Sequence, residues 1–137
     1  MEGWQFAAEL SHLRIVARVD LPQLGFTYAS MNQAVNSTAA GEAAAFQAPG
    51  GGAAASRAVW SALRDDLQNI LGQTSANLVE AGAVMEHVVD AYLAADEGAR
   101  TSLESAWATG AAPGLQEAEE QYPPDAPPPV VIKDGTA

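Results

Sequence analysis

The stretch APGGGAAAS, at residues 48–56, interrupts the chain more strongly than any other and limits what it can fold into. A proline followed by three glycines does not continue a helix, because proline lacks an N–H donor and glycine loses the most backbone freedom on folding. Apolar residues recur at helical spacing on both sides of this stretch. We therefore predict two helices joined by a loop over residues 48–55.

Apolar residues spaced by three and four positions predict three helices in all. We expect a short helix at 5–19, a second at 21–47 with Asp20 as its N-cap, and a long third at 56–107. The predicted fold class is all-α: an antiparallel helical hairpin with a short extra N-terminal helix, forming one domain over residues 1–110. The row that defines the third helix consists of Trp60, Leu63, Leu67, Ile70, Thr74, Leu78, Ala81, Met85, Val88, Tyr92 and Ala95.

The composition changes after Gly110. Residues 111–137 contain six of the eight prolines and five acidic residues, a composition that predicts a Pro-rich acidic disordered tail. Its simplest role is to keep the protein soluble. A docking motif is the alternative, because Val130, Val131 and Ile132 are consecutive aliphatic residues.

Charge and hydropathy exclude several classes of partner. The formal net charge of −11 opposes binding to nucleic acid and to anionic membranes. No run of about 18 apolar residues is present, so we expect no membrane span. Glu2 stands where a secretory signal carries positive charge, and Glu9 and Arg14 interrupt the apolar residues that follow, so we expect no signal for the general (Sec) export pathway.

We find no catalytic or cofactor-binding pattern. His87 lies between Glu86 and Asp90, but it belongs to neither a His-Glu-x-x-His nor a Glu-x-x-His pattern, and the sequence has no cysteine. The three glycines are not followed by the Gly-Lys-Ser/Thr of a phosphate-binding loop, and no serine is flanked by the glycines of a nucleophile elbow. We therefore expect neither enzymatic activity, nor a cofactor, nor a metal site.

The apolar content is mostly alanine, so few side chains carry a large burial energy. A second copy of the chain or a small helical partner would supply the missing apolar contacts. Trp60, Leu63 and Leu67 follow the loop directly and are the candidate interaction surface. For Trp60 itself the first interpretation is structural, with its ring covering the end of the hairpin, and the recognition surface is the alternative.

The stretch VVDAYLAADEG, at residues 88–98, places Tyr92 four residues before Asp96, which brings a ring and a carboxylate to one helix face. A glycine-containing turn between two helices, a tryptophan beside it, abundant alanine, the absence of cysteine and a late Tyr-x-x-x-Asp occur together here. This combination resembles the WXG superfamily of actinobacterial type VII (ESX) secretion substrates, over about residues 4–107. The Trp-x-Gly motif itself is absent, because Ser61 and Ala62 follow Trp60.

The resemblance implies a helical hairpin that pairs into a dimeric four-helix bundle and leaves the cell folded, without the Sec pathway. It also implies that Tyr92 and Asp96 form the signal that the type VII machinery reads. The expected function is thus a non-enzymatic type VII secretion substrate or effector, secreted or at the cell surface. The alternative is a cytoplasmic acidic adaptor or immunity-type protein that binds a basic protein partner.

Overall fold

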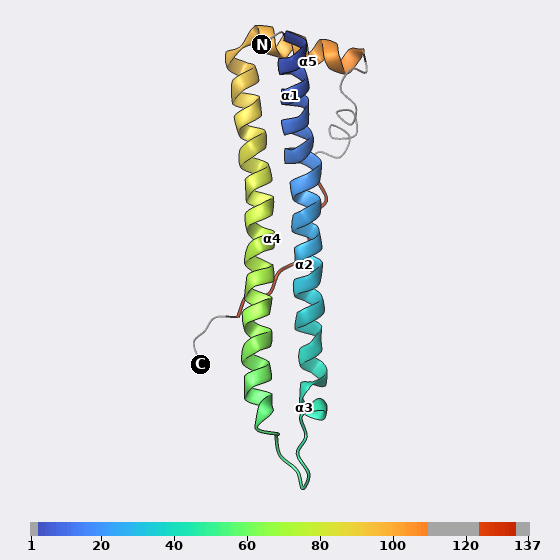
Figure 1. Ribbon diagram of the computed structural model, residues 1–137, viewed down its shortest axis with the longest axis vertical. Coiled ribbons are helices and arrows are strands. Elements are labelled where there is room, and N and C mark those ends of the chain that lie inside the picture. The colour runs from blue at the N-terminus through green and yellow to red at the C-terminus, as the bar shows by residue number, and fades with distance from the viewer. Residues whose placement is uncertain (1–2, 110–123, 134–137) are drawn as a thin grey trace. The chain divides into compact units, whose positions relative to one another are not determined.

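The computed structural model describes residues 3–109 and 124–133, and within these ranges the regular structure is entirely helical (Figure 1). The predicted all-α class is confirmed. The helices in chain order are α1 (Gly3–Ile15), the π-helix η1 (Val16–Asp20), α2 (Leu21–Ser37), the 3-10 helix η2 (Thr38–Gly41), α3 (Glu42–Ala45), α4 (Ser56–Ala95) and α5 (Glu97–Ala108).

The chain divides into two compact units. Unit 1 comprises Met1–Leu24 and Leu78–Ala126, and unit 2 comprises Gly25–Asn77 and Pro127–Ala137. The helices α2 and α4 each contribute residues to both units, so each unit is built from segments far apart in the sequence. None of the helices in the described ranges is long and apolar enough to cross a membrane.

The first two predicted helices follow one another without a loop. A π-helical turn over Val16–Asp20 joins them, and the N–H of Leu21 donates to the carbonyl of Val16 instead of to that of Ala17. Pro22 has no N–H and cannot make the regular helical bond, and a widened turn lets the helix continue past such a residue. Asp20 is therefore part of a continuous helical path and not the isolated N-cap that the sequence predicted.

The second helix is shorter than predicted. Ser37 and Thr38 donate their hydroxyls to the carbonyls of Ala34 and Val35, both at 2.7 Å, and the chain tightens into η2 where these side-chain bonds occur. Beyond α3 comes the loop, in which Gly50, Gly51 and Gly52 have φ between 87° and 94°, a region that favours glycine. The α4 helix begins at Ser56, where the sequence predicted a helix to start.

The long third helix is interrupted near its end. The α4 helix stops at Ala95, and Asp96 starts α5 by accepting the N–H of Ala99 on its Oδ1 at 3.0 Å. The predicted single helix over 56–107 is therefore two helices. Apolar periodicity missed the break because the residues on both sides keep helical spacing, whereas the stop depends on the cap formed by Asp96.

In unit 1, α1 packs against α5, and one apolar cluster is buried. Gly82 of α4 belongs to the same unit and lies close to the turn η1. A Cβ at this position would come within 2.9 Å of the carbonyl oxygen of Ala17, so a side chain here would force the two segments apart. The buried cluster consists of Leu10, Val89, Leu93, Ala99 and Leu103.

In unit 2, α2 packs against α4 through small and polar side chains. The buried hydroxyl of Ser75 donates to the carbonyl of Gly25 at 2.6 Å, and the buried amide of Asn32 donates to the carbonyl of Gln68 at 2.7 Å. Because the earlier residue of α2 pairs with the later residue of α4, the two segments run in opposite directions within this unit. The helices are thus held at close range by hydrogen bonds.

The C-terminal stretch differs from the predicted disordered tail. Residues 127–133 lie in unit 2 as an extended segment, and their main chain bonds to the side chains of Asn32 and Asn69. Proline-rich composition predicted disorder, but an extended chain needs no helix propensity once side chains of other elements satisfy its backbone. The rest of the predicted tail, residues 111–123 and 134–137, lies outside the described residues.

Candidate functional site

The predicted signal pair lies at the end of α4. The side chain of Tyr92 is 43% exposed, and its hydroxyl donates to Oδ2 of Asp96 at 3.4 Å. The N–H of Asp96 donates to the carbonyl of Tyr92 at 3.0 Å, so the backbone keeps helical spacing up to the break. The structure therefore brings the two residues together on the surface, where a phenol and a carboxylate are presented side by side.

Asp96 also has a structural role. One carboxylate oxygen caps α5 through the N–H of Ala99, while the other accepts the hydroxyl of Tyr92. A carboxylate at a helix N-terminus is favoured by the helix dipole as well as by the hydrogen bond. Any test of Asp96 as a signal must therefore preserve the cap.

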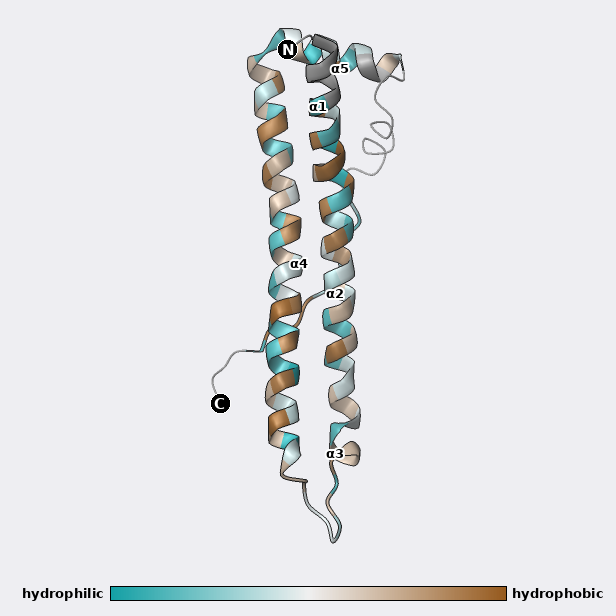
Figure 2. Cartoon of the chain, in the orientation of Figure 1, coloured by the Kyte–Doolittle hydropathy of each residue, from teal (hydrophilic) through white to brown (hydrophobic). Residues whose placement is uncertain are grey.

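The candidate interaction surface points outward from unit 2. Trp60 is 40% exposed, Leu63 62% and Leu67 45%, and Ile70 continues the same face at 61%. Figure 2 shows hydrophobic residues recurring along this part of α4. We call Trp60, Leu63, Leu67 and Ile70 the outer row.

The outer row faces outward because another stripe of α4 packs inside the unit. Gln68, Gly72 and Ser75 are buried, and they follow the same spacing of three and four residues. Their small or hydrogen-bonding side chains let α2 approach closely, whereas a leucine there would hold the helices apart. The sequence row was identified correctly as one helix face, but it is not the face that packs against α2.

Trp60 has an internal contact as well. Its ring centroid lies 5.9 Å from that of Phe46, with the ring planes tilted by 32°, an arrangement within the favourable range for aromatic pairs. Phe46 begins the loop, and its carbonyl accepts the N–H of Ala54 at 2.7 Å. Trp60 thus contacts the residue at the start of the loop and keeps part of its ring exposed.

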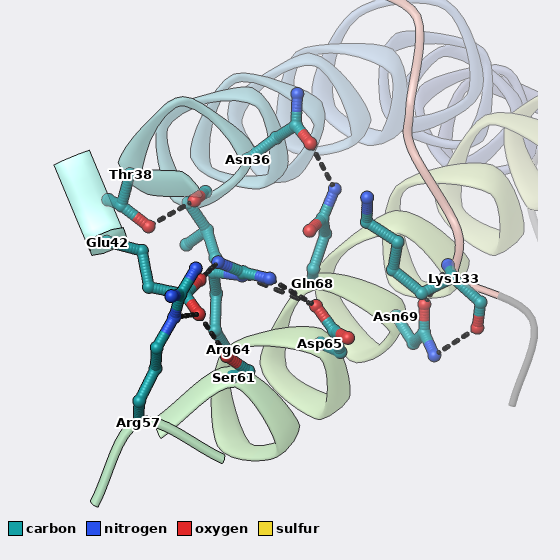
Figure 3. A network of polar contacts seen from close by, with 11 residues as sticks. Asn36, Thr38, Glu42, Arg57, Ser61, Arg64, Asp65, Gln68, Asn69 and Lys133 are labelled. Carbon is teal, nitrogen blue, oxygen red and sulfur yellow. Dashed lines mark hydrogen bonds and ion pairs between the residues drawn. The ribbon is translucent and has the colours of Figure 1, made fainter. Parts of the chain in front are cut away.

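A polar network next to the loop was not anticipated from the sequence (Figure 3). The nearly buried carboxylate of Glu42 accepts hydrogen bonds from Ser61, from Arg57 at 3.1 Å and from Arg64. The hydroxyl of Ser61 and the guanidinium of Arg57 are the main causes that lower the pKa of Glu42 from 4.5 to about 2. Asp65 and Glu42 in turn raise the pKa of Arg64. These contacts fix the short α3 helix on the first turns of α4.

Unit 1 has its own buried carboxylate. Glu86 is 3% exposed and accepts a hydrogen bond from Nε of Arg18 at 2.7 Å as well as one from its Nη2. Arg14 lies 3.6 Å from Glu86 and 3.4 Å from Asp90. The Glu86, His87 and Asp90 group considered in the sequence is therefore divided: the two carboxylates pair with arginines, and His87 is exposed.

Within the described ranges no group of three or more histidine, aspartate and glutamate side chains is placed to hold a metal ion. The arginines are likewise engaged. Every arginine of the chain pairs with a carboxylate, and these residues are Arg14, Arg18, Arg57, Arg64 and Arg100.

Sequence reasoning missed the residues that bind the C-terminal segment. Asn32 of α2 and Asn69 of α4 each hold a main-chain amide of residues 131–133. A buried asparagine in a helix is one available signal, because it is a poor helix former and requires a partner for its amide. The aliphatic residues after Pro129 are the other signal, and these had been noted as an alternative docking motif.

Comparison with protein-family models, with curated proteins and with solved structures gives no significant match.

Proposed function

We propose that this chain is a non-enzymatic protein associated with type VII secretion, exported in a folded state, which works by docking on a second copy of itself or on a small helical partner. The complete antiparallel hairpin over residues 1–110 is part of this proposal. The observation that carries it is the outer row on α4, whose large apolar side chains are 40% to 62% exposed.

The outer row has the form of a helix-docking face. Its members recur every three or four residues on one side of a helix, which is the pattern that packs against another helix. Burying a leucine or isoleucine side chain completely contributes about 1.5 to 3 kcal/mol, so covering the exposed parts of this row supplies several kcal/mol. Unit 2 buries few large apolar side chains of its own, which makes such a contact valuable to it.

Docking is tested by the state of association of the purified chain. We expect light scattering to show a dimer at tens of micromolar and Leu63→Glu to convert it into a monomer, because a charge in the centre of a buried apolar face is costly. Ala62→Glu is the matched control, since it adds the same charge at an exposed neighbouring position outside the outer row. A monomeric wild type would remove the homodimer from the proposal and leave only the small helical partner.

Export is proposed to depend on Tyr92 and Asp96. What supports this is their exposure, their mutual hydrogen bond and their position late in the second arm, where the family carries its signal. We expect tagged wild type to accumulate in the culture filtrate of an actinobacterial host with a type VII system, and Tyr92→Ala to remain in the cells. Val88→Ala, one turn earlier on an exposed part of α4, should be exported normally.

Asp96 is best tested by Asp96→Asn. Asparagine is as good an N-cap as aspartate, so the start of α5 is preserved while the charge is removed. Retention of this variant would assign the charge to export, and normal export would show that Asp96 acts only as a cap. A cytoplasmic marker protein must be absent from the filtrate in every case.

One observation favours a second candidate, the cytoplasmic acidic adaptor. Because every arginine is paired within the chain, the net charge of −11 is carried by a surface with little free positive charge. Such a surface attracts a basic protein. Retention of wild type inside cells, together with salt-sensitive capture by a basic partner, would select this function over export.

A further inference from the structure

The C-terminal segment is held by its main chain. Val131 donates its N–H to Oδ1 of Asn32 at 2.8 Å and accepts a hydrogen bond from Nδ2 of the same side chain at 2.9 Å. Both polar groups of one peptide residue are thus paired with both polar atoms of one carboxamide. The other hydrogen of Nδ2 is donated to the carbonyl of Gln68 at 2.7 Å, which fixes the orientation of the Asn32 amide.

The same arrangement is repeated two residues later. Lys133 donates its N–H to Oδ1 of Asn69 at 2.6 Å and accepts from Nδ2 at 2.9 Å (Figure 3). Two residues before Val131, the carbonyl of Pro129 accepts a hydrogen bond from Nε2 of Gln33. Alternate residues of an extended chain present their main-chain groups to the same side, so the side chains of Asn32, Asn69 and Gln33 bind one edge of the segment.

Room for the segment is made by Gly72 of α4. A Cβ at this position would lie 3.3 Å from Cγ1 of Ile132, 3.5 Å from Cβ of Val130 and 3.1 Å from Nδ2 of Asn32. The missing side chain therefore allows two aliphatic residues of the segment to lie directly on the helix. We call Asn32, Gln33, Asn69 and Gly72 the asparagine site.

We propose that the asparagine site is a binding site for extended peptide segments, now occupied by the chain's own residues 129–133, and that it accepts the same segment of a second copy of the chain. Amide side chains that pair with the main chain do not distinguish one side chain from another, as in other cases of strand recognition. The segment stays on the surface: Ile132 is 44% exposed and none of residues 127–133 is buried. It can therefore leave the site without opening a core.

The contacts define the chemical class of the ligand. The positions of Val131 and Lys133 need an N–H and so exclude proline, whereas Pro129 contributes only a carbonyl and is compatible. The two positions beside Gly72 hold β-branched residues, which favour the extended conformation. A second copy of the chain carries the same residues 129–133 and so supplies such a ligand. The exchange of identical elements between protomers is a recognised route to association.

The test uses a fluorescent peptide of residues 124–137 and the full-length chain carrying Val131→Pro and Lys133→Pro. This variant has lost both N–H donors, so its own segment no longer occupies the site. We expect saturable binding in fluorescence polarisation, at least tenfold tighter than to the wild-type chain, where the resident segment competes. A peptide carrying the same two prolines should not bind.

Further variants assign the binding to the asparagine site. Adding Asn32→Ala should weaken binding about tenfold or more, because two main-chain hydrogen bonds are lost. Asn77→Ala, the same change at an exposed position of α4, should have no effect.

If the double-proline chain has lost helicity in circular dichroism, excess peptide is titrated onto wild type, and binding must fail for Asn32→Ala. Absence of saturable binding to the folded chains overturns the proposal. The peptide assay does not involve the outer row, so its result is independent of the proposed docking function.

Discussion

The helices of the two units are held together by different kinds of buried side chain. Unit 1 is held by an apolar cluster that includes Leu10, Leu93 and Leu103, whereas the buried positions that join α2 to α4 in unit 2 include Asn32, Gln68 and Ser75. Hydrogen-bonding side chains require a particular partner at a particular position, while leucines pack in several ways. In unit 2 the register of the helices therefore depends on polar contacts, and most of its large apolar side chains are exposed, with Leu71 as a buried exception.

Among the described residues, each unit has one buried glutamate that is paired with arginines. Glu86 of α4 meets Arg18 of η1 in unit 1, and Glu42 of α3 meets Arg57 and Arg64 of α4 in unit 2. A carboxylate removed from water is costly unless it is paired, so each of these pairs specifies which segments belong together.

The largest effect is expected when the pair of unit 1 is broken. Glu86→Ala removes the carboxylate that accepts two hydrogen bonds from the guanidinium of Arg18, a residue only 6% exposed, and removal of one member of a buried pair costs about 3 to 5 kcal/mol. We expect the free energy of unfolding in urea to fall by this amount. Glu80→Ala, at an exposed position of the same helix, is the control, and equal losses for the two variants would refute the importance of the pair.

The second test separates the inner cluster from the outer row with one type of substitution. Leu93→Ala removes a side chain that is 8% exposed and is expected to cost about 2 to 3 kcal/mol of unfolding free energy. Leu63→Ala removes one that is 62% exposed, and its cost to the unfolding of the isolated chain should stay within about 0.5 kcal/mol. The comparison requires a protein concentration at which the chain is monomeric.

How far the sequence predicted the fold depends on the type of signal. The Pro-Gly-Gly-Gly loop and the helical periodicity of α4 were readable because a backbone restriction and a repeated pattern are local properties. The face of α4 that packs against α2 could not be predicted from the sequence. Gln68 and Ser75 lie on one stripe of this helix and Leu67 and Ile70 on another, and both stripes have helical spacing. Spacing alone does not show which of the two stripes packs against α2, and in unit 2 it is the stripe with small and hydrogen-bonding side chains.

For the candidate sites, too, local features could be predicted from the sequence and contacts between distant residues could not. Tyr92 and Asp96 could be paired from their spacing alone, since the helix fixes their separation. Val131 and Lys133, the C-terminal partners of Asn32 and Asn69, lie 99 and 64 residues away in the sequence, and nothing local indicates them. Proline content predicted disorder for the segment that these asparagines bind. Composition reflects the conformational preference of the isolated segment and does not include hydrogen bonds from side chains of other elements.

A smaller effect is expected from a single polar contact of unit 2. Ser75→Ala removes the hydrogen bond to the carbonyl of Gly25 in a position that is 1% exposed, and we expect a loss of about 1 kcal/mol of unfolding free energy. Ser30→Ala removes an exposed bond within one helix, to the carbonyl of Phe26, and should change stability by less than about 0.5 kcal/mol. Equal changes would mean that the bond between α2 and α4 contributes nothing beyond a local one.

The last effect is expected only in acid and should belong to unit 2. Ser61 and Arg57 lower the pKa of Glu42 from 4.5 to about 2 in the folded protein, so its carboxylate binds a proton less readily there than in the unfolded chain. The resulting stabilisation is complete above pH 4.5 and is lost as the pH falls toward 2. We expect the urea midpoint of the wild type to decline over this window more steeply than that of Glu42→Gln, which has no proton to gain at this position. Parallel declines would show that the contacts of Glu42 do not favour its charged form, and that the network at α3 positions the loop without contributing to the acid sensitivity of unit 2.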